Sequence, residues 1–100
     1  MDNLEIKFND VPHSKPIRAF VQSRFERWRS KQPVYGDTSE AAQVEFFRSP
    51  DEEKIGCVIE FRKGAASWKS MEYGKGIHST FELALKHLTE HKLLVDERSA

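Results

Sequence analysis

Cationic side chains crowd one segment of the sequence, from Ser14 to Lys31. When this segment is plotted as a helix, Arg24 falls among its apolar residues, with Arg27 and Lys31 on one shoulder. Arg18 and Arg29 lie on the other shoulder. Glu26 is the only acid in the segment. Arginine binds phosphate well because its planar guanidinium presents a fork of hydrogen-bond donors. The pattern predicts a basic ridge for phosphate groups, formed by Arg18, Arg24, Arg27, Arg29 and Lys31.

The same charges also fit an ordinary solvated helix surface. In that interpretation the stem of Arg24 lies along the apolar edge while its charged end stays in water. Charged helix surfaces are common, so the sequence alone leaves both interpretations open.

A second predicted helix adds to the positive charge. It carries Lys86, His87, His91 and Lys92 together with Glu82 and Glu90, and Lys75 lies in the loop before it. The acids gather elsewhere, at Asp37 and Glu40 and in the run Asp51, Glu52 and Glu53. Lys plus Arg and Asp plus Glu are both 16, yet a chain with no net charge can still have one positive face.

Residues for metal or catalytic chemistry are few. His87 and His91 are spaced i, i+4 and both could reach one metal, but no third ligand is evident and the pattern HExxH is absent. Two surface histidines are the simpler interpretation. Cys57 alternates with inward-facing residues and is expected to be a small buried side chain. With no nucleophile elbow, phosphate-binding loop or paired carboxylates, we expect neither an enzyme nor a cofactor.

Length and composition indicate one domain. The chain has 100 residues, of which 38% are hydrophobic and 11% aromatic, enough for one core. A single cysteine indicates a reducing compartment. The first residues resemble no secretory signal, and no apolar run approaches the roughly 18 residues that span a bilayer. We expect a complete, soluble, cytoplasmic chain.

Hydrophobic periodicity predicts an α+β fold of order β-α-β-β-β-α. Alternation predicts strands at 4–8, 42–47, 55–62 and 66–73, and a helix with Ser14 as N-cap ends by Pro33. Ser79 and Glu82 have the spacing of a capping box, which predicts a helix from there to about Leu94. Two helices on one face of a four-stranded sheet would bury both apolar stripes. We expect one domain at 1–95 and a frayed tail at 96–100.

The aromatic residues fit a core better than a base-stacking surface. An RNA-recognition motif would run β-α-β-β-α-β and carry aromatic signatures, which this sequence lacks beyond its first steps at Arg62 to Ala66. The aromatic residues at core-facing positions are Phe8, Phe20, Phe25, Phe46 and Phe81.

The order of these elements and several local patterns resemble one known family, the ribosome hibernation promoting factors, also called ribosome-associated inhibitors or protein Y. The similarity covers about residues 4 to 92. It includes a strand at Ile6-Lys7-Phe8, then His13-Ser14 and Ile17-Arg18, and later Gly74-Lys75 with Phe81-Glu82 and Leu88. The sequence departs from the family at Gly76-Ile77-His78, Glu82 and Glu90. It resembles the short form, without the dimerising C-terminal domain.

The resemblance implies a fold akin to a double-stranded-RNA-binding domain with an extra first strand. It also implies a non-catalytic protein, expected to be a monomer in isolation, that binds the 16S-type rRNA of the small ribosomal subunit in the channel for mRNA and tRNA. Such binding would inhibit translation and protect idle ribosomes in stressed bacteria. The alternative is a protein-interaction or regulatory module of the same fold. The residues predicted to bind RNA are Arg18, Arg24, Arg27, Lys31, Lys75, Lys86, His87 and His91.

Overall fold

The computed structural model describes residues 4–31, 40–51, 53–63 and 66–99, with only the backbone described for Ala66 and residues 90–99. The predicted order of elements is confirmed, and the chain has an α+β fold. The elements are β1 (Leu4–Asn9), α1 (Lys15–Ser30), β2 (Glu40–Arg48), β3 (Ile55–Lys63), β4 (Ala66–Gly74) and α2 (Ile77–Ser99).

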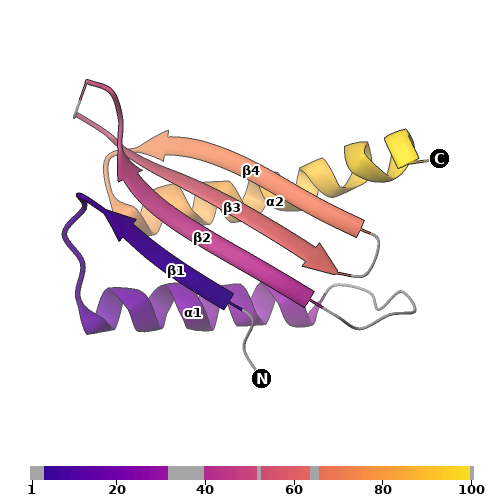
Figure 1. Cartoon of the computed structure of the whole chain (residues 1–100), viewed down its shortest axis with the longest axis horizontal. Coiled ribbons are helices and arrows are strands. Elements are labelled where there is room, and N and C mark those ends of the chain that lie inside the picture. The colour runs from indigo at the N-terminus through magenta and orange to yellow at the C-terminus, as the bar shows by residue number, and fades with distance from the viewer. Residues whose placement is uncertain (1–3, 32–39, 52, 64–65, 100) are drawn as a thin grey trace.

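The strands form one four-stranded mixed sheet in the order β1-β2-β3-β4 (Figure 1). The pair β1 and β2 is parallel, whereas β2, β3 and β4 pair antiparallel. Parallel neighbours need a crossover connection, and α1 provides it. Both helices begin at the same end of the sheet and run in the same direction (Figure 1). Arg24 of α1 accordingly contacts Glu82 of α2, and Trp28, one turn later, contacts Thr89.

The core lies between the helices and one face of the sheet, as the alternation predicts. Phe25 of α1 meets Phe61 of β3 edge-on, with ring centroids 5.7 Å apart. Phe81 of α2 packs on Phe46 of β2 at 6.2 Å. Both helices therefore cover the same sheet face, as in a two-layer α+β domain. The most deeply buried side chains include Val21, Phe25, Val44, Phe46, Cys57, Ile59, Phe61, Phe81 and Leu88.

The start of α1 is as predicted, but the start of α2 is not. Ser14 is the N-cap of α1, and its hydroxyl accepts from the amide of Ile17 at 3.4 Å. The capping box predicted at Ser79 is wrong, because α2 already begins at Ile77. The carbonyl of Gly76 accepts the first helical hydrogen bond, from the Thr80 amide at 3.0 Å, and the Ser79 hydroxyl donates back to that carbonyl.

The end of α2 also differs from the prediction. The helix passes Leu94 and continues to Ser99, so the tail expected to fray at 96–100 has a helical backbone as far as that residue. The physical reason is in the sequence, since 77–99 contains no glycine or proline to stop a helix. The domain boundary at 95 stays a prediction.

The second sheet face is covered by neither helix, and it carries an apolar corner. Met71 and Tyr73 of β4 are 51% and 41% exposed. Tyr73 meets Phe47 of β2 at 5.8 Å with the rings nearly perpendicular. The Phe47 ring lies on Gly56 of β3, where an added Cβ would come within 2.4 Å of it. Glycine at 56 is thus what lets Phe47 lie flat on the sheet.

Replacing Gly56→Ala should therefore force the Phe47 ring off the sheet. We expect a loss of about 1–3 kcal/mol in the free energy of unfolding, the usual cost of overpacking. Urea denaturation measures it. Gly76→Ala is the matched control, because a Cβ there meets only the Ser79 hydroxyl at 3.7 Å. Equal stability of the two variants would contradict the close packing of Phe47 on Gly56.

Candidate nucleic-acid interface

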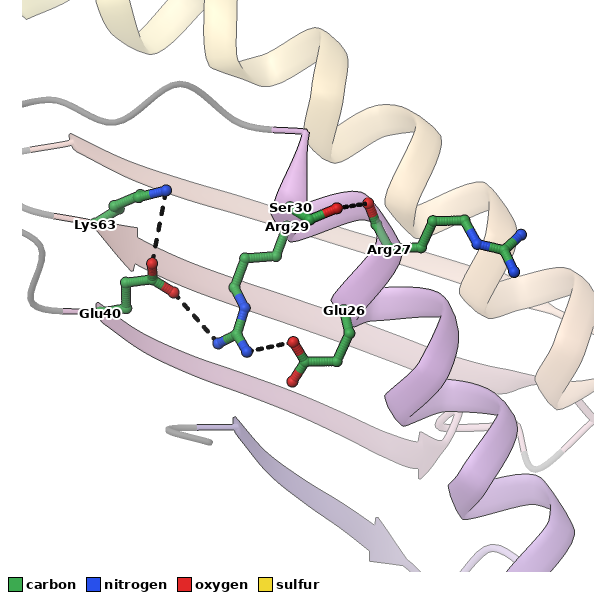
Figure 2. A network of polar contacts seen from close by, with 6 residues as sticks. All are labelled: Glu26, Arg27, Arg29, Ser30, Glu40 and Lys63. Atoms are coloured by element: carbon green, nitrogen blue, oxygen red, sulfur yellow. Dashed lines mark hydrogen bonds and ion pairs between the residues drawn. The ribbon is translucent and has the colours of Figure 1, made fainter. Parts of the chain in front are cut away.

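The predicted basic ridge divides between the two shoulders of α1. Arg24 reaches α2, where it contacts Glu82. Arg18 and Arg29 reach the opposite way, to the backbone of Ile6 in β1 and to Glu40 in β2. Figure 2 shows Arg27 pointing away from Arg29, on the side of α1 nearer α2. Helical spacing puts Lys31 on the shoulder of Arg24 and Arg27. Only that shoulder belongs to the surface between the helices.

Arg24 forms a bidentate ion pair with Glu82. Its Nε and one terminal nitrogen donate to the two carboxylate oxygens at 2.8 and 2.9 Å. Both side chains are partly exposed, at 33% and 41%. Glu82, which the sequence assigns to a capping box of its own helix, therefore binds a side chain of α1 instead. The sequence gives one signal for this pair, because both residues fall on the shoulders of amphipathic helices that must pack side by side.

The pair lies in a groove of about 540 Å³ between α1 and α2. Trp28 also lines the groove, and its indole N–H donates to the Thr89 hydroxyl at 2.7 Å. Thr89 in turn donates to the Leu85 carbonyl at 3.2 Å. The indole N–H and the threonine hydroxyl in this groove are thus satisfied within the protein. The groove is lined by Arg24, Trp28, Ser79, Glu82, Leu83, Leu85, Lys86 and Thr89.

Arg29 is part of a network of charges that the sequence does not reveal. Figure 2 shows its guanidinium between Glu26 and Glu40, with Lys63 on the other side of Glu40. The Arg29–Glu40 and Lys63–Glu40 pairs are 3.3 and 3.6 Å long. The side chains of Arg29 and Lys63 are only 12% and 6% exposed. This network ties the last turn of α1 to β2 and β3 and takes Arg29 out of any exposed ridge.

Glu40 corrects the expected separation of charges. The sequence groups it with the acids that lie away from the basic helix, yet it contacts Arg29. Glu82, which the sequence places on the second helix, contacts Arg24 of α1. The neutral composition thus reflects ion pairs within the fold as well as acids placed elsewhere. Asp51 does lie apart, in the turn between β2 and β3, where the Ser49 hydroxyl and the Glu53 amide donate to it and lower its pKa.

Four of the predicted RNA-binding cations are exposed and form no ion pair within the described part of the chain. Arg27 and Lys31 lie on the shoulder of α1 nearer α2, called the outer shoulder below. Lys86 follows Glu82 by one turn of α2. Lys75 lies between β4 and α2. A long, exposed, uncompensated cation is the side chain that can neutralise a phosphate at least cost. Their role in RNA binding stays a prediction.

The other predicted residues have different surroundings. Arg18 is exposed, with its guanidinium 5.3 Å from the centroid of the Phe8 ring and 3.4 Å from the Ile6 carbonyl oxygen. His87 contacts Glu72 of β4 through Nδ1. The side chain of His91 lies outside the described residues. Among those that are described, no three His, Cys, Asp or Glu side chains form a group that could hold a metal.

Cys57 is fully buried, as expected for a small core residue. Burial raises the pKa of its thiol to about 12. The thiol is therefore protonated at neutral pH, and a protonated, buried thiol is a poor nucleophile. In the described residues, no helix is both long and apolar enough to cross a membrane.

Comparisons with known proteins bear on the fold. No family model matches the sequence, and no curated protein does. A crystal structure of the Thermus thermophilus Protein Y N-terminal domain superposes with a TM-score of 0.70 at 15% identity, over 91% of this chain and 96% of that one. A ribosomal subunit interface protein from Coxiella burnetii gives 0.68 at 11% identity, over 96% of both chains. The resemblance predicted from the sequence is thus confirmed at the level of the fold.

Replacing Glu40, the acid in Figure 2 that contacts both Arg29 and Lys63, should destabilise the fold. Glu40→Gln leaves Lys63 and Arg29 with less compensation in a buried setting, so we expect a loss of about 2–4 kcal/mol in the free energy of unfolding. Trp28 and Trp68, both buried, allow urea denaturation to be followed by fluorescence. Glu60→Gln is the control, because Glu60 pairs with Lys69 on the surface, where a loss of about 0–1 kcal/mol is normal. Equal losses would show that the network does not hold the end of α1.

Proposed function

We propose that this chain is a non-catalytic, cytoplasmic, ribosome-binding protein. It occupies the mRNA and tRNA channel of the small subunit through the outer faces of α1 and α2, inhibits translation and stabilises idle ribosomes under stress or in stationary phase. One observation supports this above the rest. In a fold shared with a ribosomal subunit interface protein, Arg27, Lys31 and Lys86 are exposed and unpaired, within the described part of the chain, along adjacent helices.

The mechanism requires only that cations neutralise phosphate charges and that the volume of the protein fills the channel. Arg27, Lys31, Lys75 and Lys86 contact phosphates of the 16S-type rRNA, and each contact releases counterions. The molecule measures 40 × 29 × 17 Å, so its presence in the channel excludes mRNA and tRNA by volume. No bond is made or broken, and no cofactor takes part.

Two of the residues predicted to bind RNA, Arg24 and Arg18, contribute less to binding in this proposal than the other exposed cations do. Arg24 binds Glu82, and Arg18 lies over the Phe8 ring on the far shoulder of α1. Side chains position a protein on RNA by donating hydrogen bonds to its phosphates, and a side chain already bound within the protein is less available for this. The binding surface is therefore centred on the exposed cations that have no ion pair among the described residues. His87, in contact with Glu72, contributes at the edge of this surface.

A second candidate function is a protein-interaction module of the same fold. The exposed Met71 and Tyr73, of which Tyr73 packs on Phe47, favour it, since methionine and aromatic side chains are enriched in protein interfaces. A protein captured by the wild type and lost with Met71→Ser and Tyr73→Ser together, while ribosome binding is unchanged, would support this function.

The ribosome proposal is tested by neutralising the outer shoulder of α1. Arg27→Gln with Lys31→Gln should weaken co-sedimentation with small subunits and reduce the slope of log affinity against log salt by about two, one for each lost phosphate contact. Lys7→Gln with Lys69→Gln is the matched control. It removes the same charge from the uncovered sheet face and should leave the slope unchanged. An unaltered slope in the α1 variant would exclude this shoulder as the binding site.

A further inference from the structure

We propose that Glu82 determines the specificity of this RNA-binding surface by occupying the phosphate-binding edge of Arg24. The inference rests on the proposed function and deepens it. In the free protein the carboxylate substitutes for a phosphate at Arg24, so RNA that offers only a backbone finds fewer available cations. Glu82 thus lowers the affinity for unspecific RNA, so that stable binding requires a target that makes further contacts with the protein.

The geometry of the pair is the first support. The two parallel bonds, at 2.8 and 2.9 Å, use the Nε edge of the guanidinium. Arginine presents this same fork to the two oxygens of a carboxylate or of a phosphate. One edge cannot hold both groups at once, so a phosphate that uses this edge must displace Glu82.

The choice of partner is the second support. Lys86 lies four residues after Glu82, the favourable spacing for an ion pair within a helix. The carboxylate instead reaches across the groove to Arg24, and Lys86 has no ion pair in the described residues. Glu82 therefore lowers the positive charge in the groove at Arg24 and leaves Lys86 without an ion pair among the described residues.

Exposure is the third support. Arg24 and Glu82 keep 33% and 41% of their side-chain surface accessible, so an RNA can reach the pair from outside. A pair at the surface is also weak enough to be exchanged for another anion. Specificity is a difference between affinities and is often raised by repulsive elements, and a carboxylate among the cations of a basic surface repels RNA that offers only phosphates.

The test compares Glu82→Gln with the wild type in binding a plain RNA duplex over a salt series. We expect tighter binding and a log–log salt slope steeper by about one, because Arg24 becomes free to contact one more phosphate. Arg24→Gln combined with Glu82→Gln should return to the wild-type slope, since the gain requires Arg24. Circular dichroism confirms that the variants are folded.

Glu60→Gln is the matched control for net charge. It makes the same charge change and also removes the carboxylate partner of a cation, Lys69, but on the uncovered sheet face. The proposal is overturned if Glu82→Gln behaves like Glu60→Gln, or if the double variant keeps the gain. Where binding of the wild type to the duplex is too weak for a slope, the order of elution from heparin, a polyanion, decides in the same way. Neither measurement uses ribosomes, so failure here is distinguishable from failure of the proposed function.

Discussion

Trp28 is the contact on which the arrangement of both helices depends. Its indole packs edge-on against Phe61 at 5.4 Å and against Trp68 at 6.5 Å, which fixes α1 on β3 and β4. Its N–H donates to Thr89 of α2 at 2.7 Å. One side chain thus joins two helices and two strands, burying a large apolar ring while its polar group is satisfied. Because Trp28 lies one turn after Arg24, this contact also sets the helix separation at which Arg24 reaches Glu82.

The charges of the chain are best understood from this packing. Once α1 is fixed on the sheet, its two shoulders face different partners. The shoulder of Arg18 and Arg29 brings Arg29 to Glu40, where Lys63 completes a partly buried network. The outer shoulder meets α2, where a single acid, Glu82, compensates Arg24. The cations of this segment therefore fall into two sets. One set holds α1 on the sheet, and the other lies on the surface beside α2.

The sequence predicts the fold well because periodicity carries most of the information. Alternation at Val44 and Phe46, and the helical spacing of Val21, Phe25 and Trp28, require burial on one side, and all five are buried. Helix ends are predicted less well, because a cap depends on local geometry. Ser79 and Glu82 have the right spacing for a capping box, yet the Gly76 carbonyl begins the helix and leaves the carboxylate free for Arg24.

The candidate site is harder to predict than the fold because pairing across elements decides which charges remain available. Arg24, Arg27 and Arg29 look alike along the sequence, but the first binds a carboxylate of α2, the second is exposed and the third is almost buried. Their difference depends on the distance between α1 and its neighbours, which no local pattern contains. It follows that the total charge of such a domain says little about binding a polyanion. The relevant quantity is the number of cations that the fold leaves unpaired on one surface, and in this chain one carboxylate in the interhelical groove changes that number.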